Sequence, residues 1–179
     1  MNLTLETSRL LLRPFDLSDA PFLFKMDANP NVHKYLWQKP TLEMEESIKI
    51  IEYIHKQYAE NKIGRFATIL KETNEFIGWT GIKYINDHVE NGNTNFYDYG
   101  YRLDEPHWGK GYATEATIAW LDHGFRQMQI PVMHAYTHHA NGASNHILTK
   151  VGMELIENYT AADGVLWNWW KLENNQNND

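Results

Sequence analysis

A short glycine turn sets the strongest limit on how this chain can fold. Gly109 and Gly111 lie between a strand-like segment, 96–103, and a helix-forming segment that starts at Tyr112. Glycine permits unusual backbone angles and the close approach of a ligand, and the start of a helix adds positive potential. The backbone N–H groups of such a turn can point at one phosphate or diphosphate. The pattern predicts a phosphate site, although a plain strand-to-helix turn could carry the same two glycines.

The composition is that of one globular domain. The chain has 179 residues, of which 42% are hydrophobic, and no apolar run is long enough to span a bilayer. It has no cysteine, which excludes a thiol nucleophile and a disulfide framework. The first residues lack the basic and apolar regions of a signal peptide, so we expect a cytoplasmic protein without a membrane partner. We expect the domain to cover residues 1–173 and the polar tail 174–179 to be disordered.

The formal charge of −7 argues against a nucleic-acid partner, because nucleic-acid-binding proteins usually carry a basic face. An acidic surface suits a cationic substrate such as an amine, but it also serves solubility alone. Aromatic residues make up 13% of the chain, including 7 tryptophans. Most should lie in the core, while the cluster of Trp167, Trp169 and Trp170 could also wall a cleft.

Hydrophobic periodicity predicts a chain that mixes strands and helices. Alternating or short apolar stretches predict strands, and apolar residues three to four positions apart predict helices. A strand–helix–strand crossover makes the fourth and fifth strands parallel, while the other strands pair antiparallel. The predicted strands are 9–14, 65–70, 76–85, 96–103, 132–137, 153–159 and 165–172. The predicted helices begin near residues 16 and 41 and span 112–127 and 143–151, and 86–95 is a polar loop.

The residues around the glycine turn resemble the GNAT superfamily of acyl-CoA N-acyltransferases. In the segment WGKGYATEA (108–116), Gly111 and Ala113 fit the last two positions of the family signature Arg/Gln-x-x-Gly-x-Gly/Ala. The signature's Arg/Gln position holds Trp108, and tryptophan is common there in the Rim-type branch of the family. The preceding segment DYGYRL (98–103) resembles the family's fourth strand.

Two further parts of the chain extend this resemblance over residues 6–172. NGAS (141–144) with KVGM (150–153) resembles the family's next helix and turn. The opening segment TSRLLLRP (7–14) is similar to the first strand of the Rim-type branch, whose known members acetylate protein N-termini. The resemblance implies an α/β (α+β) GNAT fold, with a mixed central sheet of about seven strands, about four flanking helices, and splayed fourth and fifth strands.

The resemblance also implies that acetyl-CoA is the acyl donor and that its pantetheine arm lies between the splayed strands. Its diphosphate would accept hydrogen bonds from backbone N–H groups of the turn, with Lys110 either adding charge or remaining a solvated side chain. A backbone N–H near Tyr101 or Leu103 would hold the oxyanion. The predicted coenzyme-binding residues are Tyr101, Leu103, Gly109, Lys110, Gly111, Tyr112, Ala113, Thr114 and Asn141.

The implied reaction is direct attack of a neutral amine on the acetyl thioester. A lysine-like amine costs about 4–5 kcal/mol to deprotonate at pH 7, whereas a peptide α-amine costs only about 1 kcal/mol. An α-amine therefore needs only a weak or water-relayed base. Asp98 matches the acidic residue of the family's fourth strand and is the predicted base. Equally, it could be a solvated carboxylate or pair with Arg102, which strand alternation puts on the same face.

Ser144 is the predicted acid that protonates the leaving thiolate. Many GNAT members use a tyrosine in the helix after the fifth strand, but the matching position here is Leu148. In Rim-type members a serine of an Asn-x-x-Ser motif has been assigned this role, and Asn141 and Ser144 fit that motif. Alternatively, Ser144 is an ordinary residue of the helix N-terminus. Asn141 would bind the pantetheine arm or cap the helix.

The histidines are expected to hold no metal. His134, His138 and His139 lie close together in the sequence, but no carboxylate or cysteine stands at ligand spacing, and the family needs no metal. His138 could instead line the cleft and relay a proton. By analogy with the family, His33 and Tyr35 border the acceptor pocket, so the predicted substrate-binding residues are His33, Tyr35 and His138.

The resemblance implies an N-acetyltransferase that acts on a primary amine, and its Rim-type features favour the α-amine of a protein or peptide. One alternative is an enzyme for a small amine, such as a polyamine or an aminoglycoside. Another is a GNAT-like module that binds acyl-CoA without catalysis. Asp98 and Ser144 favour catalysis, because a pure binder requires neither. Dimers are frequent among relatives, which leaves a homodimer open.

Overall fold

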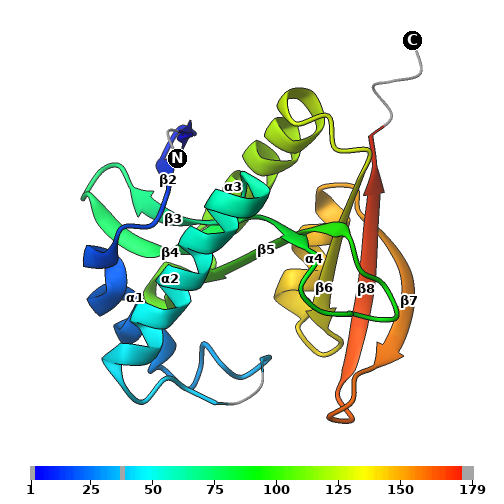
Figure 1. Cartoon of the computed structure of the whole chain (residues 1–179), viewed down its shortest axis with the longest axis horizontal. Coiled ribbons are helices and arrows are strands. Elements are labelled where there is room, and N and C mark those ends of the chain that lie inside the picture. Colours follow the sequence, from blue (N-terminus) through cyan, green and yellow to red (C-terminus); the bar gives the residue numbers. More distant parts are fainter. Residues whose placement is uncertain (1–2, 37–38, 175–179) are drawn as a thin grey trace.

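The computed structural model describes residues 3–36 and 39–174, which form one mixed sheet with helices packed against it (Figure 1). The sheet has 8 strands in the order β1-β2-β3-β4-β5-β6-β8-β7, and β5–β6 is the one parallel pair among them. The strands are β1 (Leu5–Glu6), β2 (Leu10–Arg13), β3 (Arg65–Leu70), β4 (Glu75–Ile85), β5 (Phe96–Leu103), β6 (Val132–His138), β7 (Glu154–Thr160) and β8 (Leu166–Glu173).

The sheet has one strand more than the sequence predicts. β1 is only 2 residues long and pairs with the far end of β2, so it is too short to show a hydrophobic period. The seven predicted strands all occur, close to their predicted bounds. The predicted mixed α/β fold is confirmed.

The strands β5 and β6 separate soon after they begin to pair. They are in register only at Tyr97↔Met133 and Asp98↔His134. Beyond Asp98, β5 continues beside β4 as far as Leu103, while β6 continues beside β8. Figure 1 shows the result: β2 to β5 form one half of the sheet, and β6, β8 and β7 form a second half that turns away from it. The splayed pair is therefore present as predicted, and it opens the sheet at its middle.

Four α-helices accompany the sheet in the described residues, which agrees with the predicted number. They are α1 (Ala20–Asp27), α2 (Met44–Asn61), α3 (Tyr112–Asp122) and α4 (Gly142–Lys150). α2 begins at a capping box formed by Glu43 and Glu46, and its apolar residues Ile51 and Ile54 are buried. None of these helices is both long enough and apolar enough to cross a membrane.

The core ties the helix after the glycine turn to the sheet. Phe66 of β3 contacts the ring of Tyr58 from α2 at 5.5 Å and the ring of Trp120 from α3 at 4.9 Å between centroids. Trp120 is fully buried, and its indole N–H donates to the hydroxyl of Thr80 at 3.0 Å. This packing gives α3, and with it the turn before α3, a rigid base.

The predicted disordered tail begins at Asn174, directly after β8. The backbone N–H of Asn174 donates to the carbonyl of Pro131 at 2.9 Å, so this residue is still attached to the domain. The rest of the segment predicted to be disordered, 175–179, lies outside the described residues.

Candidate active site

The glycine turn lies between the end of β5 and the start of α3. Gly109 has a φ of 72° and Gly111 a φ of 81°, in the left-handed region that favours glycine. The indole N–H of Trp108 donates to the carbonyl of Leu103 at 2.7 Å, which ties the turn to the end of β5. A Cβ built at Gly109 would meet no atom within 4 Å, so the space beside this residue is open.

The turn has backbone N–H groups to offer a ligand. Among the described residues, none accepts a backbone hydrogen bond from Gly109, Lys110 or Gly111. α3 follows at once, and the first N–H groups of a helix have no partner within it. The predicted donors of 109–114 are thus consecutive, and the three residues at the turn are exposed. Such a set of donors at a helix N-terminus suits a phosphate or diphosphate.

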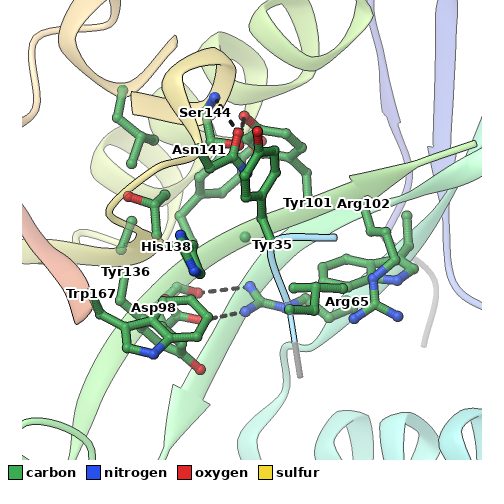
Figure 2. Close-up of a pocket in the computed structure, with 17 residues that line it drawn as sticks. Tyr35, Arg65, Asp98, Tyr101, Arg102, Tyr136, His138, Asn141, Ser144 and Trp167 are labelled. Atoms are coloured by element: carbon green, nitrogen blue, oxygen red, sulfur yellow. Dashed lines mark hydrogen bonds and ion pairs between the residues drawn. The ribbon is translucent and has the colours of Figure 1, made fainter. Parts of the chain in front are cut away.

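A cleft of about 140 Å³ opens where β5 and β6 separate (Figure 2). Aromatic rings form much of its wall, namely those of Tyr35, Trp79, Tyr136 and Trp167 together with two tyrosines of β5. Three of its lining side chains are carboxylates or guanidiniums, and only one of these three is acidic. They are Arg65, Asp98 and Arg102.

Asp98 lies on the floor of this cleft and pairs with Arg65, not with Arg102. The guanidinium of Arg65 donates from Nη2 to Oδ2 of Asp98 and from Nη1, at 2.9 Å, to the backbone carbonyl of the same residue (Figure 2). Arg102 instead pairs with Asp27 of α1 at 2.9 Å. A Cβ at Gly100 would come within 2.8 Å of Nη2 of Arg65. The absence of a side chain at Gly100 therefore leaves room for Arg65 to reach the carboxylate.

The second oxygen of Asp98, Oδ1, receives no hydrogen bond from any residue that the structure describes. The side chain as a whole is only 2% exposed. Burial raises the pKa of Asp98, against the opposing effect of the Arg65 guanidinium. A carboxylate with one occupied oxygen, one unoccupied oxygen and a raised pKa can accept a proton from a group in the cleft.

Tyr101 and Ser144 meet across the opening between β5 and α4. The phenol of Tyr101 donates to Oγ of Ser144 at 3.0 Å, and both residues line the cleft (Figure 2). Burial raises the pKa of Tyr101 to about 12, so the phenol stays protonated at neutral pH. Because Ser144 accepts from Tyr101, its own hydroxyl hydrogen remains free for a third group.

Asn141 is the N-cap of α4, one of the two roles considered for it. Its side-chain oxygen accepts a hydrogen bond from the backbone N–H of Ser144 at 3.2 Å. The cap uses the backbone of Ser144 and leaves its side chain free to face the cleft. Asn141 also lines the cleft itself.

The predicted substrate-binding residues separate into two groups. Tyr35 and His138 line the cleft, with their rings 5.5 Å apart between centroids. The ring of His138 accepts from the N–H of Ala140 at Nδ1, so its neutral form carries the hydrogen on Nε2. His33 is 6% exposed and is not among the residues that line the cleft. It lies near Asp27 and Arg102, and burial lowers its pKa.

The three histidines of β6 and the following turn point to different surroundings. His134 packs against Phe96 and Trp169, and His139 bonds to Asn168 through Nδ1 at 3.0 Å, whereas His138 faces the cleft. Nowhere in residues 3–36 and 39–174 do three His, Cys, Asp or Glu side chains gather as a metal site would require.

The cleft holds two polar groups whose roles were not predicted from the sequence, the guanidinium of Arg65 and the hydroxyl of Tyr101. Arg65 was assigned to a strand and given no role, although its register opposite Gly81 and next to Gly100 leaves it room to cross the sheet. Tyr101 was predicted only as a backbone donor, and its hydroxyl becomes important because α4 brings Ser144 within reach. Gly81 and Gly100 are a signal in the sequence for the placement of Arg65, whereas no local pattern indicates the contact of the Tyr101 hydroxyl.

Comparisons with known proteins agree with this geometry. The GNAT acetyltransferase domain matches residues 9–154. The N-acetyltransferase p20 of Bacillus licheniformis is 34% identical over 166 residues, which cover 91% of this chain and 90% of that protein. A solved GNAT-family acetyltransferase from Bacillus anthracis superposes with a TM-score of 0.80 at 21% identity, over 97% of this chain and 100% of that one.

The fold is also shared with RimL, the ribosomal L7/L12 alpha-N-protein acetyltransferase, in its complex with coenzyme A. The TM-score is 0.79 at 20% identity, over 96% of this chain and 98% of RimL. The domain match covers more than three quarters of the 179 residues and includes the glycine turn and all the cleft-lining residues except Trp167. The chain therefore belongs to the GNAT family of acetyltransferases and is an N-acetyltransferase enzyme.

Proposed function

We propose that this enzyme transfers an acetyl group from acetyl-CoA to the α-amine of a protein or peptide by direct attack of the amine. One observation carries the proposal. A carboxylate with an unoccupied oxygen, on Asp98, and a hydroxyl pair, Tyr101 with Ser144, line one cleft between the splayed strands. The cleft thus has one group to take a proton and another to give one, as acyl transfer to an amine requires.

The residues of the turn fit the coenzyme. The consecutive backbone N–H groups of 109–114 would bind the diphosphate, and the absence of side chains at Gly109 and Gly111 lets it approach the backbone. Hydrogen bonds to a charged group contribute about 1.5–3 kcal/mol each, so three or four of them would anchor the ligand with little help from the exposed Lys110. Acetyl-CoA supplies the activated acetyl thioester. The coenzyme A complex of RimL supports the same assignment.

Asp98 would act as the base for the attacking amine. Its Oδ1 can take the proton while Oδ2 stays bound to Arg65, so the ion pair fixes the carboxylate in place. Burial raises the pKa of Asp98, which increases the affinity of this oxygen for a proton. A peptide α-amine needs only about 1 kcal/mol to lose its proton at pH 7, so a carboxylate of this kind is strong enough.

Ser144 would donate the proton that the departing thiolate requires. Its Oγ accepts from the phenol of Tyr101, which leaves its own hydrogen free to point into the cleft. As Ser144 gives up this hydrogen, the phenol proton can move toward its Oγ. Tyr101 is held in the protonated form by burial, which raises its pKa to about 12. The pair therefore stores a proton next to the reacting atoms.

The charges of the cleft favour an acceptor with a single amine. Among the described residues that line the cleft, Asp98 is the one acidic residue, and Arg65 already neutralises it. Arg65 and Arg102 are paired with Asp98 and Asp27, so the described lining has no free carboxylate to bind the extra amines of a polyamine or an aminoglycoside. The aromatic wall suits an uncharged side chain beside the α-amine. RimL, named for α-N-acetylation of a ribosomal protein, supports the same class of acceptor.

A panel of acceptors tests the proposal. The enzyme is incubated with acetyl-CoA and with short peptides, spermidine or kanamycin, while thiol release and acetylated products are measured by mass spectrometry. We expect acceptor-dependent release with peptides that have a free α-amine, and none with the same peptides after N-terminal blocking. Release only with spermidine or kanamycin would favour the small-amine alternative. Binding of acetyl-CoA without release for any acceptor would favour a non-catalytic module.

A further inference from the structure

Thr7, Arg9 and Glu115 form a hydrogen-bonded cluster, the clasp, that contacts the backbone of the glycine turn. Arg9, just before β2, donates from Nη1 to the backbone carbonyl of Lys110 at 2.9 Å, although the two residues are 101 positions apart. Lys110 is the residue between the two glycines of the turn. The clasp thus reaches the one peptide group, Lys110–Gly111, whose orientation decides where the N–H of Gly111 points.

Glu115 of α3 fixes Arg9 in this position. Its carboxylate accepts from Nε of Arg9 at 2.6 Å, from the backbone N–H of Arg9 at 2.8 Å and from the hydroxyl of Thr7 at 2.5 Å. The guanidinium carbon of Arg9 also lies 4.5 Å from the centre of the Tyr112 ring. Partial burial alone would raise the pKa of Glu115, but the hydrogen bonds from Thr7 and Arg9 lower it, so the carboxylate is ionised at neutral pH.

A trans peptide group places its C=O and N–H on opposite sides, and the described part of the chain has no cis peptide. Because Arg9 holds the carbonyl of Lys110, the N–H of Gly111 must point away from Arg9. Without this hold the peptide group could rotate, since glycine accepts a wide range of backbone angles. Rotation would point the carbonyl oxygen of Lys110, a partial negative charge, toward the place where the N–H should be.

We infer that Arg9 is a positioning residue that directs the N–H of Gly111 at the diphosphate of acetyl-CoA, with Thr7 and Glu115 as its supports. This inference rests on the proposed function, because it needs a diphosphate at the turn. The clasp contributes to coenzyme affinity by ordering the turn before the ligand arrives, which lowers the cost of binding. It also accounts for the Thr7 and Arg9 positions of the opening segment, which have no place in the cleft.

The test compares two acyl donors in steady-state kinetics. Acetyl-CoA carries the diphosphate, whereas S-acetylpantetheine has the same thioester and arm without it. For Arg9→Ala, we expect the KM for acetyl-CoA to rise about tenfold, the cost of roughly one net hydrogen bond. We expect the KM and kcat with S-acetylpantetheine to stay at the wild-type values. Arg126→Ala is the matched control, because Arg126 forms an exposed ion pair with Asp122 at the other end of α3.

Two further variants separate positioning from simple attraction of the diphosphate by a cation. Arg9→Lys keeps the charge but cannot hold both Glu115 and the Lys110 carbonyl in the same planar geometry, so it should resemble Arg9→Ala. Glu115→Ala removes a negative charge near the turn. Simple attraction predicts that acetyl-CoA then binds more tightly, whereas positioning predicts that it binds several-fold more weakly. All variants are first checked for wild-type circular dichroism and melting behaviour.

Each outcome has one meaning. A raised KM for acetyl-CoA alone, in Arg9→Ala, Arg9→Lys and Glu115→Ala, supports the clasp. An unchanged KM for acetyl-CoA in Arg9→Ala, an equal loss with S-acetylpantetheine, or tighter binding in Glu115→Ala overturns it. Failure of the proposed function looks different, because the wild-type enzyme would then show no preference for acetyl-CoA over S-acetylpantetheine.

Discussion

The phenol of Tyr101 donates to Oγ of Ser144 at 3.0 Å and so joins the edge of β5 to the first turn of α4. The strands β5 and β6, which pair at Tyr97 and Asp98, have separated by this point, and the hydroxyl pair spans the gap. The position at which many GNAT members carry a tyrosine is Leu148 in this chain, and Leu148 is 1% exposed. The phenol that contacts α4 in the cleft therefore comes from a strand, and its hydrogen-bond partner is a serine.

Removing the Ser144 hydroxyl should slow the chemical step without weakening coenzyme binding. We expect Ser144→Ala to lower kcat by about 100-fold, the lower end of what a positioned acid contributes. The cap of α4 should survive, because Asn141 accepts from the backbone N–H of this residue, which alanine retains. Tyr101→Phe should lower kcat less, and in the Ser144→Ala background it should add almost nothing. If the double variant lost kcat by the product of the two single losses, a relay through the serine would be contradicted.

Asp98→Asn should reveal the base through the pH dependence of its defect. If Asp98 takes the proton of the amine, kcat/KM should fall by about 100-fold at pH 6.5. The loss should shrink above pH 9, where a peptide α-amine with a pKa of about 7.8 is already neutral. A purely structural role would give the same loss at every pH. Arg65→Lys is the companion variant, because it leaves the carboxylate in place while removing the fork that orients it.

Gly111→Val should abolish acetyl-CoA binding, while Lys110→Ala should weaken it only modestly. A side chain at Gly111 is strained at a φ of 81°, and its Cβ would lie 3.4 Å from the guanidinium of Arg9. Lys110 is exposed, so solvent screens its charge. Isothermal titration with coenzyme A measures both. Wild-type affinity in a folded Gly111→Val protein would show that the diphosphate binds elsewhere.

The sequence predicted the parts of this molecule that depend on short-range patterns. The glycine turn lies between a strand and a helix because the residues on either side have the matching periodicity, and Asn141 caps α4 because its side chain suits an N-cap. The separation of β5 and β6 followed from the family resemblance. No residue in either strand indicates this separation, because it arises from pairing with other strands. β5 stays paired with β4, and β6 stays paired with β8.

The contacts that the sequence did not reveal join distant residues. Asp98 pairs with Arg65, 33 positions away, because three adjacent strands bring them together and Gly100 has no side chain to block the path. The nearer candidate, Arg102, is drawn to Asp27 of α1 instead. His33 was predicted beside Tyr35 at the acceptor pocket. The chain turns between them, so that Tyr35 lines the cleft while His33 is buried next to Asp27 and Arg102.

The stability of the fold should fall in mild acid because of partly buried histidines. Burial lowers the pKa of His134, and the charge of Lys171 also lowers it, against the opposing effect of a hydrogen bond with the Trp170 backbone. Its ring packs between Phe96 and Trp169, and its Nδ1 is buried without a hydrogen-bond partner in the described residues. The unfolded chain, in which the pKa is near 6.5, then binds a proton that the folded chain does not. Stability is therefore complete above that pH and is lost as the pH falls below it, by at most about 1.4 kcal/mol per pH unit for one proton.

Replacing this ring by a hydrocarbon of similar shape isolates the effect. We expect His134→Phe to keep the free energy of unfolding near the wild-type value at pH 7.5, since the aromatic packing is retained. Between pH 7.5 and 5.5 the free energy of unfolding of this variant should fall less steeply than that of the wild type. The two slopes should differ by up to about 1.4 kcal/mol per pH unit, the value for one proton. Urea unfolding at the two pH values measures this. His146→Gln, on the exposed face of α4, is the control and should keep the wild-type slope. An unchanged slope in His134→Phe would mean that other groups, such as His33 and His123, carry the acid sensitivity, because burial lowers the pKa of both.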